Sequence, residues 1–223
     1  MNWKLAGLIV FVALAAVAAW MTAAMQSAPE LHRTGRQFTL HQTLIRNSDP
    51  VIVLGDSIVE ASTLPRSICG RAIVNAGLNG ASTASDLGGW LSAALAGRRA
   101  AAIVVSLGGN DAMAPGGRSK EAFVAGYANL LAELSKLSPR LAVLQIVPVE
   151  AKGWLTADFQ AKTMQTIEAF NSGLRDLAAR HGAQFIALPA MAAPFTGDGT
   201  HLNTTGYLAW DQAVMQAAGV VCG

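Results

Sequence analysis

The sequence predicts an α/β domain built on a parallel sheet that is covered by helices on both faces. Short apolar runs alternate with longer stretches of helical periodicity, which is the pattern of repeated strand–helix units. The strand candidates are apolar throughout rather than alternating, as expected for strands buried on both faces. The run 51–54 also stops at Gly55 and is followed by Ser57, so a buried strand presents a hydroxyl at its carboxyl end. Ligand crevices of open α/β sheets lie outside these ends.

Composition narrows the class of protein. A chain of 223 residues is long enough for one domain with a sizeable core. A net charge of +2 favours neither a nucleic-acid partner nor an acidic substrate. Two cysteines, Cys69 and Cys222, exclude a disulfide-rich scaffold, and they are either bonded to each other or two buried thiols. No cluster of His and Cys has metal-ligand spacing, and we expect neither a metal nor a cofactor.

The N-terminal segment 1–25 is predicted to direct the chain to a membrane. Residues 5–25 carry no charge, and their length matches the roughly 20 apolar residues of a spanning helix. Trp3 and Trp20 would be separated by about the thickness of the apolar layer on a helix, as in aromatic belts. This pattern favours an uncleaved anchor over a cleaved signal. Both alternatives place the remaining chain outside the cytoplasm, anchored facing the periplasm or exterior, or secreted.

Three segments are expected in all. The membrane segment 1–25 is followed by a polar, irregular tether at 26–49, with a short helix near 38–44. Residues 50–223 form the folded domain, and Pro50 sets the start of the first strand.

The domain alternates strand and helix candidates. Strands are expected at 51–54, 72–75, 101–107, 141–147 and 184–188. Helices are expected at 83–96, 119–137, 158–180 and 204–218. Ser82, Ser119 and Thr204 are candidate N-caps, and Gly182 suits a helix end.

A serine hydroxyl needs a base to take its proton, and the chain has four histidines. His32 and His41 precede the first strand, and His181 ends a predicted helix, where the helix dipole accounts for it. His201 differs because it lies in a loop after the last strand, with Asp198 three residues upstream. A carboxylate in that position can hold the imidazole tautomer and stabilise the imidazolium.

Acyl transfer also needs hydrogen-bond donors where negative charge develops on the carbonyl oxygen. The N–H of Ser57 is one donor. The glycine-rich turn 75–80 and the side-chain amide of Asn110 are two further candidates, since each follows a predicted strand. All these groups therefore meet at one edge of a parallel sheet.

These motifs together resemble those of the SGNH/GDSL hydrolases, which are serine esterases and lipases. The first block is matched by Gly55-Asp56-Ser57, and the second by the turn 75–83. The third block, Gly-x-Asn-Asp, is matched by Gly108 to Asp111, and the last, Asp-x-x-His, by Asp198 to His201. The four blocks occur in the family's order over residues 51 to 218.

The resemblance implies a flavodoxin-like three-layer α/β/α sandwich with a five-stranded parallel sheet, preceded by an N-terminal hydrophobic helix. It also implies that Ser57 is the nucleophile, His201 the base and Asp198 its orienting partner. The oxyanion hole would consist of Ser57, Gly80 and Asn110, with Gly77 as the alternative to Gly80. The Gly-x-Ser-x-Gly motif of α/β-hydrolases is absent.

Other residues near these motifs have simpler interpretations. Asp56 and Asp111 are expected to make loop hydrogen bonds, because Asp198 already supplies the carboxylate. Trp90 and Trp210 fall within predicted helices and are expected in the core. Trp154, in the loop after the fourth strand, is the best candidate for a substrate contact. Residues 112–118 are expected to form a flexible rim.

The sequence thus predicts an exported or membrane-tethered esterase that hydrolyses a small-molecule, glycan or lipid ester through an acyl-enzyme. The alternative is a non-catalytic domain of the same fold that binds an envelope glycan or protein. A third reading, a nucleotide binder, lacks the phosphate-loop signature. Substrate specificity and oligomeric state stay open.

Overall fold

The computed structural model describes residues 3–222, with the backbone alone for most of the first 27 residues. The chain divides into two units, one ending at Thr39 and one running from Leu40 to the C-terminus. Helix α1, Trp3–Leu44, includes most of the first unit and enters the second. Residues 26–37 are therefore helical, which corrects the expected irregular tether, and the short helix expected near 38–44 is the end of α1.

The last turn of α1 is stabilised by packing against the core. Leu40 and Leu44 are one turn apart and only 2% and 1% exposed, so they anchor this end of the helix in the core of the second unit. The His41 Nδ1 atom lies 2.8 Å from the carbonyl oxygen of Ala94. Most side chains of the predicted membrane segment 1–25 lie outside the described part of the structure. Within the described part, no helix combines the length and apolar character that a bilayer crossing requires.

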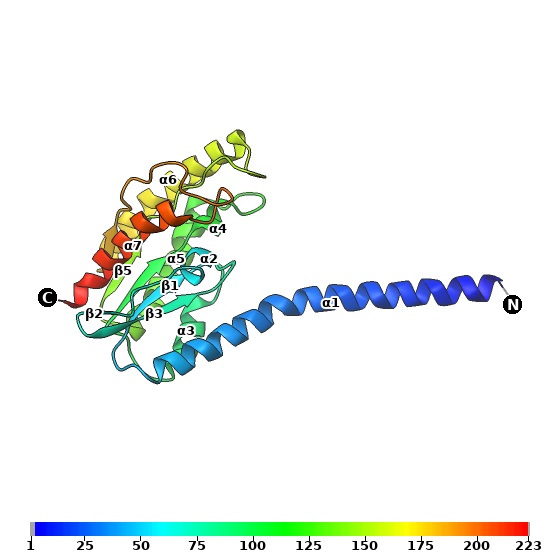
Figure 1. Ribbon diagram of the computed structural model, residues 1–223, viewed down its shortest axis with the longest axis horizontal. Helices are drawn as coiled ribbons and strands as arrows, with labels where there is room; N and C mark the ends of the chain where they lie inside the picture. The colour runs from blue at the N-terminus through cyan, green and yellow to red at the C-terminus, as the bar shows by residue number, and fades with distance from the viewer. Residues whose placement is uncertain (1–2, 223) are drawn as a thin grey trace. The chain divides into compact units, whose positions relative to one another are not determined.

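A six-stranded sheet forms the centre of the second unit, with the order β2-β3-β1-β4-β5-β6 (Figure 1). Its strands are β1 Val51–Gly55, β2 Ser67–Ile68, β3 Arg71–Gly77, β4 Ala102–Ser106, β5 Leu141–Leu144 and β6 Gln184–Ile186. All neighbours pair in parallel except β2, which is antiparallel to β3. The five expected strands are confirmed as the parallel strands of the sheet, but the sheet also has a sixth, antiparallel strand, β2, that was not expected. Strand β2 has two residues and no apolar run, so periodicity does not reveal it.

Helices pack on both faces of this sheet, giving three layers. They are α2 Ser57–Glu60, α3 Leu87–Leu95, α4 Gly109–Ala112, α5 Lys120–Leu137, α6 Ala157–Arg180 and α7 Thr204–Ala218, followed by the short 3₁₀ helix η1 Gly219–Val221. Alternate strand residues face opposite ways. Ile52 and Leu54 share a core with α3, α5 and α6, while Val51 and Val53 share one with α7. Trp90 and Trp210 are buried in these cores as predicted.

The helix starts differ in detail from the predicted caps. Ser119 caps α5 as expected, through a hydrogen bond from the N–H of Ala122. Helix α3 begins only after Asp86, whose carboxylate accepts from Gly89, while Ser82 lies in the preceding turn. Asn203 caps α7 in place of Thr204. Both corrected caps lie within four residues of the expected ones, and their side chains accept backbone hydrogen bonds as N-caps do.

The two cysteines are bonded to each other. Cys69 follows the edge strand β2, and Cys222 follows η1, with Cα atoms 5.5 Å apart. The bond ties the edge of the sheet to the C-terminal end of the chain. Of the two states that the sequence left open, the structure contains the disulfide.

Candidate active site

Close backbone packing brings Ser57 to the end of β1. A Cβ atom at Gly55 would lie 2.1 Å from the carbonyl oxygen of Ser106 on the neighbouring strand, so only glycine fits. Gly77, its register partner on β3, would place a Cβ 2.1 Å from the N atom of Glu60. The two glycines allow α2 to start directly over the strand ends. Ser57 is the first residue of that helix.

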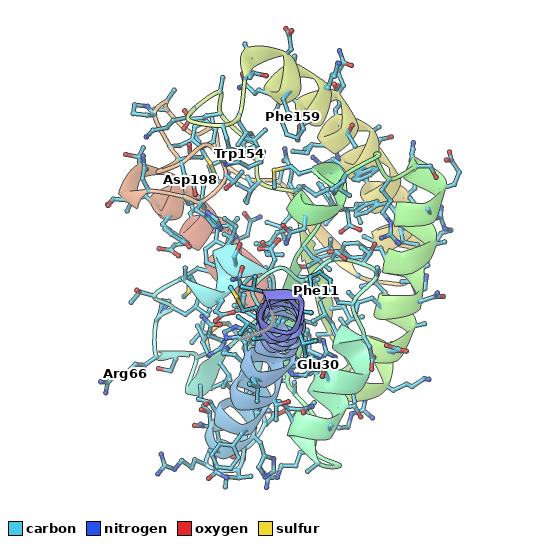
Figure 2. The ribbon with its side chains drawn as sticks, turned by 90° about the vertical axis from the view of Figure 1, so that its right-hand side faces the viewer. Phe11, Glu30, Arg66, Trp154, Phe159 and Asp198 are labelled. Atoms are coloured by element: carbon cyan, nitrogen blue, oxygen red, sulfur yellow. A yellow bond between two sulfur atoms is a disulfide. The ribbon has the colours of Figure 1, made fainter. Side chains whose placement is uncertain are left out.

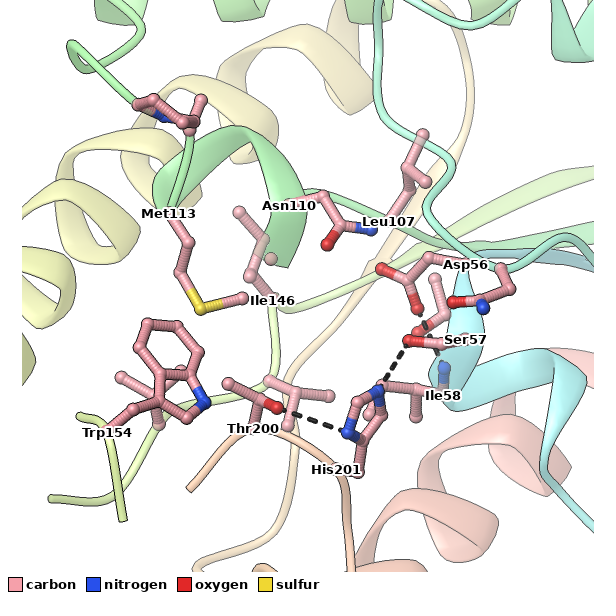
Figure 3. Close-up of a pocket in the computed structure, with 17 residues that line it drawn as sticks. Asp56, Ser57, Ile58, Leu107, Asn110, Met113, Ile146, Trp154, Thr200 and His201 are labelled. Atoms are coloured by element: carbon pink, nitrogen blue, oxygen red, sulfur yellow. Dashed lines mark hydrogen bonds between the residues drawn. The ribbon is translucent and has the colours of Figure 1, made fainter. Parts of the chain in front are cut away.

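Ser57, His201 and Asp198 form a continuous line of contacts. Figure 3 draws the contact between Ser57 and His201. His201 Nε2 lies 3.1 Å from the hydroxyl oxygen of Ser57. On the other side of the ring, Nδ1 lies 2.7 Å from Oδ2 of Asp198. The structure therefore brings together three side chains that the sequence proposed, although 144 positions separate the serine from the histidine.

Asp198 is held by its own loop. Its Oδ1 accepts hydrogen bonds from the backbone N–H of Thr200 at 2.9 Å and of His201 at 2.8 Å. Partial burial raises the pKa of Asp198, but the hydrogen bonds from His201 and Thr200 outweigh it and hold that pKa well below its usual range. The carboxylate therefore stays ionised in neutral and mildly acidic solution.

Thr200 is a contact that sequence reasoning missed. Its Oγ1 lies 3.0 Å from Oδ1 of Asp198 and 3.2 Å from Nδ1 of His201, so it bridges the two. Its place between the two motif residues is the signal that was available, because a hydroxyl in a tight Asp-x-x-His loop can reach both neighbours.

The donors expected for an oxyanion hole differ in whether they line the cavity beside Ser57. Asn110 lies in α4, lines the cavity beside Ser57, and donates from Nδ2 to the carbonyl oxygen of Ala81 at 2.8 Å. This bond joins the turn after β3 to the turn after β4. Gly80 lies in the first of these turns, exposed and with φ +73°, and it is the adjacent Asn79 that lines the cavity. Gly77, the alternative, ends β3 and is buried.

The acidic residues beside the motifs make loop hydrogen bonds, as predicted. Asp111 accepts from both the N–H and the hydroxyl of Thr83, at 3.0 and 2.6 Å, and forms an ion pair with Arg118 at 3.2 Å. Asp56 caps α2 by accepting from the N–H of Ile58 at 3.0 Å. Burial raises the pKa of Asp56 to about 6, although that hydrogen bond and the charge of His201 lower it. The sequence did not indicate this shift.

A cavity of about 370 Å³ opens beside Ser57 and His201. This volume is within the range of small-ligand sites. Polar residues lie at the Ser57 end, whereas Met113, Ile146 and Trp154 line the other end (Figure 3). Trp154 is 65% exposed, and its ring centroid is 5.7 Å from that of Phe159 (Figure 2). Trp154, the residue expected to contact substrate, therefore lies on the wall of this cavity.

The arrangement suits nucleophilic chemistry. A hydroxyl beside an imidazole, whose second nitrogen faces a carboxylate, is the geometry of an activated serine. Within the described residues, no group of three or more His, Cys, Asp or Glu side chains could hold a metal ion. On a parallel α/β sheet, this geometry indicates a hydrolase.

The chain belongs to the GDSL-like lipase/acylhydrolase family, whose model matches residues 53–209. The resemblance inferred from the four motifs is therefore confirmed. No curated protein matches the chain.

Solved structures of low sequence identity share the fold. A protein from Streptococcus pneumoniae named for platelet activating factor is 21% identical, with a TM-score of 0.70 over 89% of this chain and 98% of the other. A lipase/acylhydrolase from Enterococcus faecalis is 17% identical, with a TM-score of 0.59 over 75% and 94%. A catalytic mutant of an acetylxylan esterase from Geobacillus stearothermophilus is 15% identical, with a TM-score of 0.61 over 78% and 95%.

Proposed function

We propose that this protein is a serine ester hydrolase that works through an acyl-enzyme, with Ser57 as nucleophile, His201 as general base and Asp198 as its orienting partner. The observation that carries the proposal is the unbroken line of contacts from the Ser57 hydroxyl through His201 to Asp198. The family supports ester hydrolysis as the reaction class.

In the first half of the reaction, the Ser57 oxygen attacks the ester carbonyl carbon while His201 Nε2 takes the hydroxyl proton. The tetrahedral intermediate collapses, the C–O bond to the alcohol breaks, and the alcohol leaves with the proton from His201. Water then attacks the acyl-enzyme, again giving up a proton to His201, and the acid is released as Ser57 regains its hydrogen.

The developing oxyanion would be stabilised by the N–H of Ser57, the side-chain amide of Asn110 and the N–H of Gly80. Support for Asn110 is its position on the cavity wall beside Ser57. Its Nδ2 carries two hydrogens, so one remains for substrate while the other bonds Ala81. Loss of one such donor costs about 10²–10³ in kcat.

Relatives with related chemistry support the assignment of roles. Three solved structures of the acetylxylan esterase are described as catalytic mutants, in which an aspartate, a histidine or a serine is replaced by alanine. The aspartate and histidine are three positions apart in that chain. Asp198 and His201 have the same spacing.

We place the substrate among carboxylic esters that carry an apolar group, because one end of the cavity is lined by Met113, Ile146 and Trp154. We also propose that the domain works outside the cytoplasm, tethered by segment 1–25 or released from it. The Cys69–Cys222 disulfide supports this location, since such bonds persist in oxidising compartments.

The deciding experiment labels the full chain with a fluorophosphonate and follows hydrolysis of p-nitrophenyl esters. Ser57→Ala should abolish both labelling and turnover. Ser135→Ala is the matched control, because this exposed serine only bonds Ala132 in its own helix. A folded wild-type chain that is neither labelled nor active would overturn the proposal in favour of the non-catalytic binding domain.

A further inference from the structure

Charge is segregated between the two ends of the parallel strands, namely the edge of the sheet where the chain enters the strands and the edge where it leaves them. Four chain segments lead into neighbouring strands, namely 45–50 into β1, 96–101 into β4, 136–140 into β5 and 180–183 into β6. They contain six basic residues and one acidic residue. The basic residues are Arg46, Arg98, Arg99, Lys136, Arg140 and Arg180. We call these six residues the basic edge.

The opposite edge, where the cavity lies, has the reverse balance. Its segments, which include the short helices α2 and α4, are 56–62, 78–86, 107–119, 145–156 and 187–203. They contain six acidic residues and two basic ones. The net charge of +2 therefore conceals two edges of opposite sign.

The basic edge is continuous in space. The N–H of Ala101 donates to Pro50 at 2.8 Å, joining the first two segments, and the N–H of Ala100 donates to Leu137 at 3.0 Å, joining the second and third. Neighbouring strands are about 4.8 Å apart, so four of them span only about 15 Å. All six basic side chains are exposed.

These charges are poorly compensated from within the protein. The one acidic residue in the four segments, Asp49, forms its ion pair with Arg71 at the start of β3. In the described part of the chain, none of the six basic residues has an ion-pair partner. Clustered cations without counter-charges create a positive field that attracts an anionic surface.

We propose that the basic edge docks the domain on a membrane surface of anionic lipids. The chain reaches the domain at this edge, because Leu44 ends α1 in the core and residues 45–50 lead directly into β1. The uncharged stretch 5–25 precedes it in the same chain. Clustered Lys and Arg side chains bind anionic lipid headgroups at a membrane surface. Docking there leaves the cavity at the opposite edge open to substrate.

The test measures partition of the full chain into vesicles of phosphatidylcholine alone and of phosphatidylcholine mixed with phosphatidylglycerol. Any contribution of segment 5–25 is present in both, so the ratio of the two partition coefficients isolates the charge effect. Each basic residue near an anionic surface contributes about five-fold in binding. Arg98→Gln with Arg99→Gln should therefore lower the ratio by about 25-fold.

The matched control is Lys120→Gln with Lys162→Gln, which removes the same charge from exposed helix positions outside the basic edge. The control ratio should stay at the wild-type value, and added salt should reduce the wild-type ratio. Equal binding of wild type to both vesicles would overturn the proposal, as would equal losses in the two double variants. Binding to soluble dextran sulfate without preference for anionic vesicles would replace the lipid with a polyanionic glycan.

A separate observation concerns Glu150, in the loop after β5. Its Oε2 accepts three hydrogen bonds, from the N–H of Phe195 at 3.0 Å, the N–H of Thr196 at 2.7 Å and the hydroxyl of Thr196 at 2.5 Å. Its own N–H donates to Gly199 at 2.9 Å. Glu150 thus holds the loop that carries Asp198 and His201 at both its base and its tip.

The loop itself is closed above this anchor. Thr196 and Leu202 form an isolated antiparallel bridge, and the N–H of Gly197 donates to the carbonyl oxygen of His201 at 2.8 Å. Thr196 is only 1% exposed, so its bonds to Glu150 are shielded from water. A displacement at Thr196 would pass through this closed loop to the imidazole.

We infer that Glu150 is a positioning residue that keeps His201 Nε2 in line with the Ser57 hydroxyl, an inference that rests on the proposed function. Glu150→Ala should lower kcat by about 100-fold with little change in KM, because a misplacement of about 1 Å has that effect. Glu150→Gln keeps an oxygen acceptor and should restore most of the kcat. Gln160→Ala is the control. The Gln160 side chain, on α6, donates only to the carbonyl oxygen of Val149, the residue before Glu150.

Fluorophosphonate labelling separates the possible failures. If wild type is not labelled, the proposed function is wrong. If wild type and folded Glu150→Ala are labelled at the same rate, only the role of Glu150 is wrong. Equal losses of kcat in the Ala and Gln variants would also refute it.

Discussion

Asp198 contacts both the backbone and the ring of His201. Its Oδ1 accepts the His201 N–H at 2.8 Å, while its Oδ2 faces Nδ1 of the ring at 2.7 Å. One carboxylate therefore sets where the histidine lies and which ring nitrogen carries the proton. The two effects can be separated by substitution.

Asp198→Asn should keep the hydrogen bond from the His201 backbone N–H. It should lose the ring tautomer in which Nδ1 carries the proton. An amide NH₂ in place of Oδ2 would donate to Nδ1 and move the ring proton to Nε2, where it faces Ser57. We expect kcat to fall by about 10⁴ with KM nearly unchanged. Steady-state kinetics on a p-nitrophenyl ester measure this. A loss of less than ten-fold would show that Asp198 does not orient the base.

Asp56→Asn should change how stability depends on pH. Burial raises the pKa of Asp56 from 3.8 to about 6, so the folded protein binds this proton more tightly than the unfolded chain. Its stabilising contribution is therefore complete below about pH 4 and is lost as the pH rises through about 6. Asparagine cannot ionise, yet it keeps an oxygen for the Ile58 N–H.

The free energy of unfolding of Asp56→Asn, relative to wild type, should thus increase by up to about 3 kcal/mol between about pH 4 and pH 7. Urea unfolding at several pH values measures this difference. The pKa of Asp198 is lowered, so its contribution to stability is lost as the pH falls. This contribution is the same in wild type and variant, and it cancels when their free energies of unfolding are subtracted. A difference that does not vary with pH would contradict the prediction.

Removing the disulfide should destabilise the fold. The bond joins residues 153 positions apart, so it restricts a long loop in the unfolded chain. Cys69→Ser with Cys222→Ser should lower the free energy of unfolding by about 2–5 kcal/mol. Wild type with a reductant should unfold like the variant, and the variant should not respond to the reductant. Equal stability of reduced and oxidised wild type would count against a stabilising role.

Trp154→Ala should affect long acyl esters more than acetate. The Trp154 side chain lines the apolar end of the cavity, away from Ser57, where a short acyl group does not reach (Figure 3). Losing part of its apolar contact should lower kcat/KM for p-nitrophenyl octanoate by about five-fold. The value for p-nitrophenyl acetate should stay within about two-fold. Leu208→Ala, at a side chain that is 69% exposed and does not line this cavity, is the control. An equal loss on both esters would exclude an acyl contact.

Local pattern was enough to predict the main elements of the domain. Long amphipathic stretches and continuous apolar runs report their own secondary structure, and helix α7 has the predicted bounds, Thr204–Ala218. Short elements were not predicted. β2, α2 and α4 have two to four residues each, and they depend on contacts with the sheet. The helix expected near 38–44 is the end of α1, where Leu40 and Leu44 pack into the core, whereas the helical state of residues 26–37 was not predicted.

The sequence by itself determined the parallel α/β class, the family and the side chains proposed for catalysis, because motifs that follow strands must meet at one sheet edge. Only the tertiary structure decided which atoms face one another. It brought Ser57 within 3.1 Å of His201, joined Cys69 to Cys222 and buried Asp56. It also placed Glu150 against Thr196. These relationships join residues far apart in the chain or arise from burial, and neither property is encoded in local periodicity.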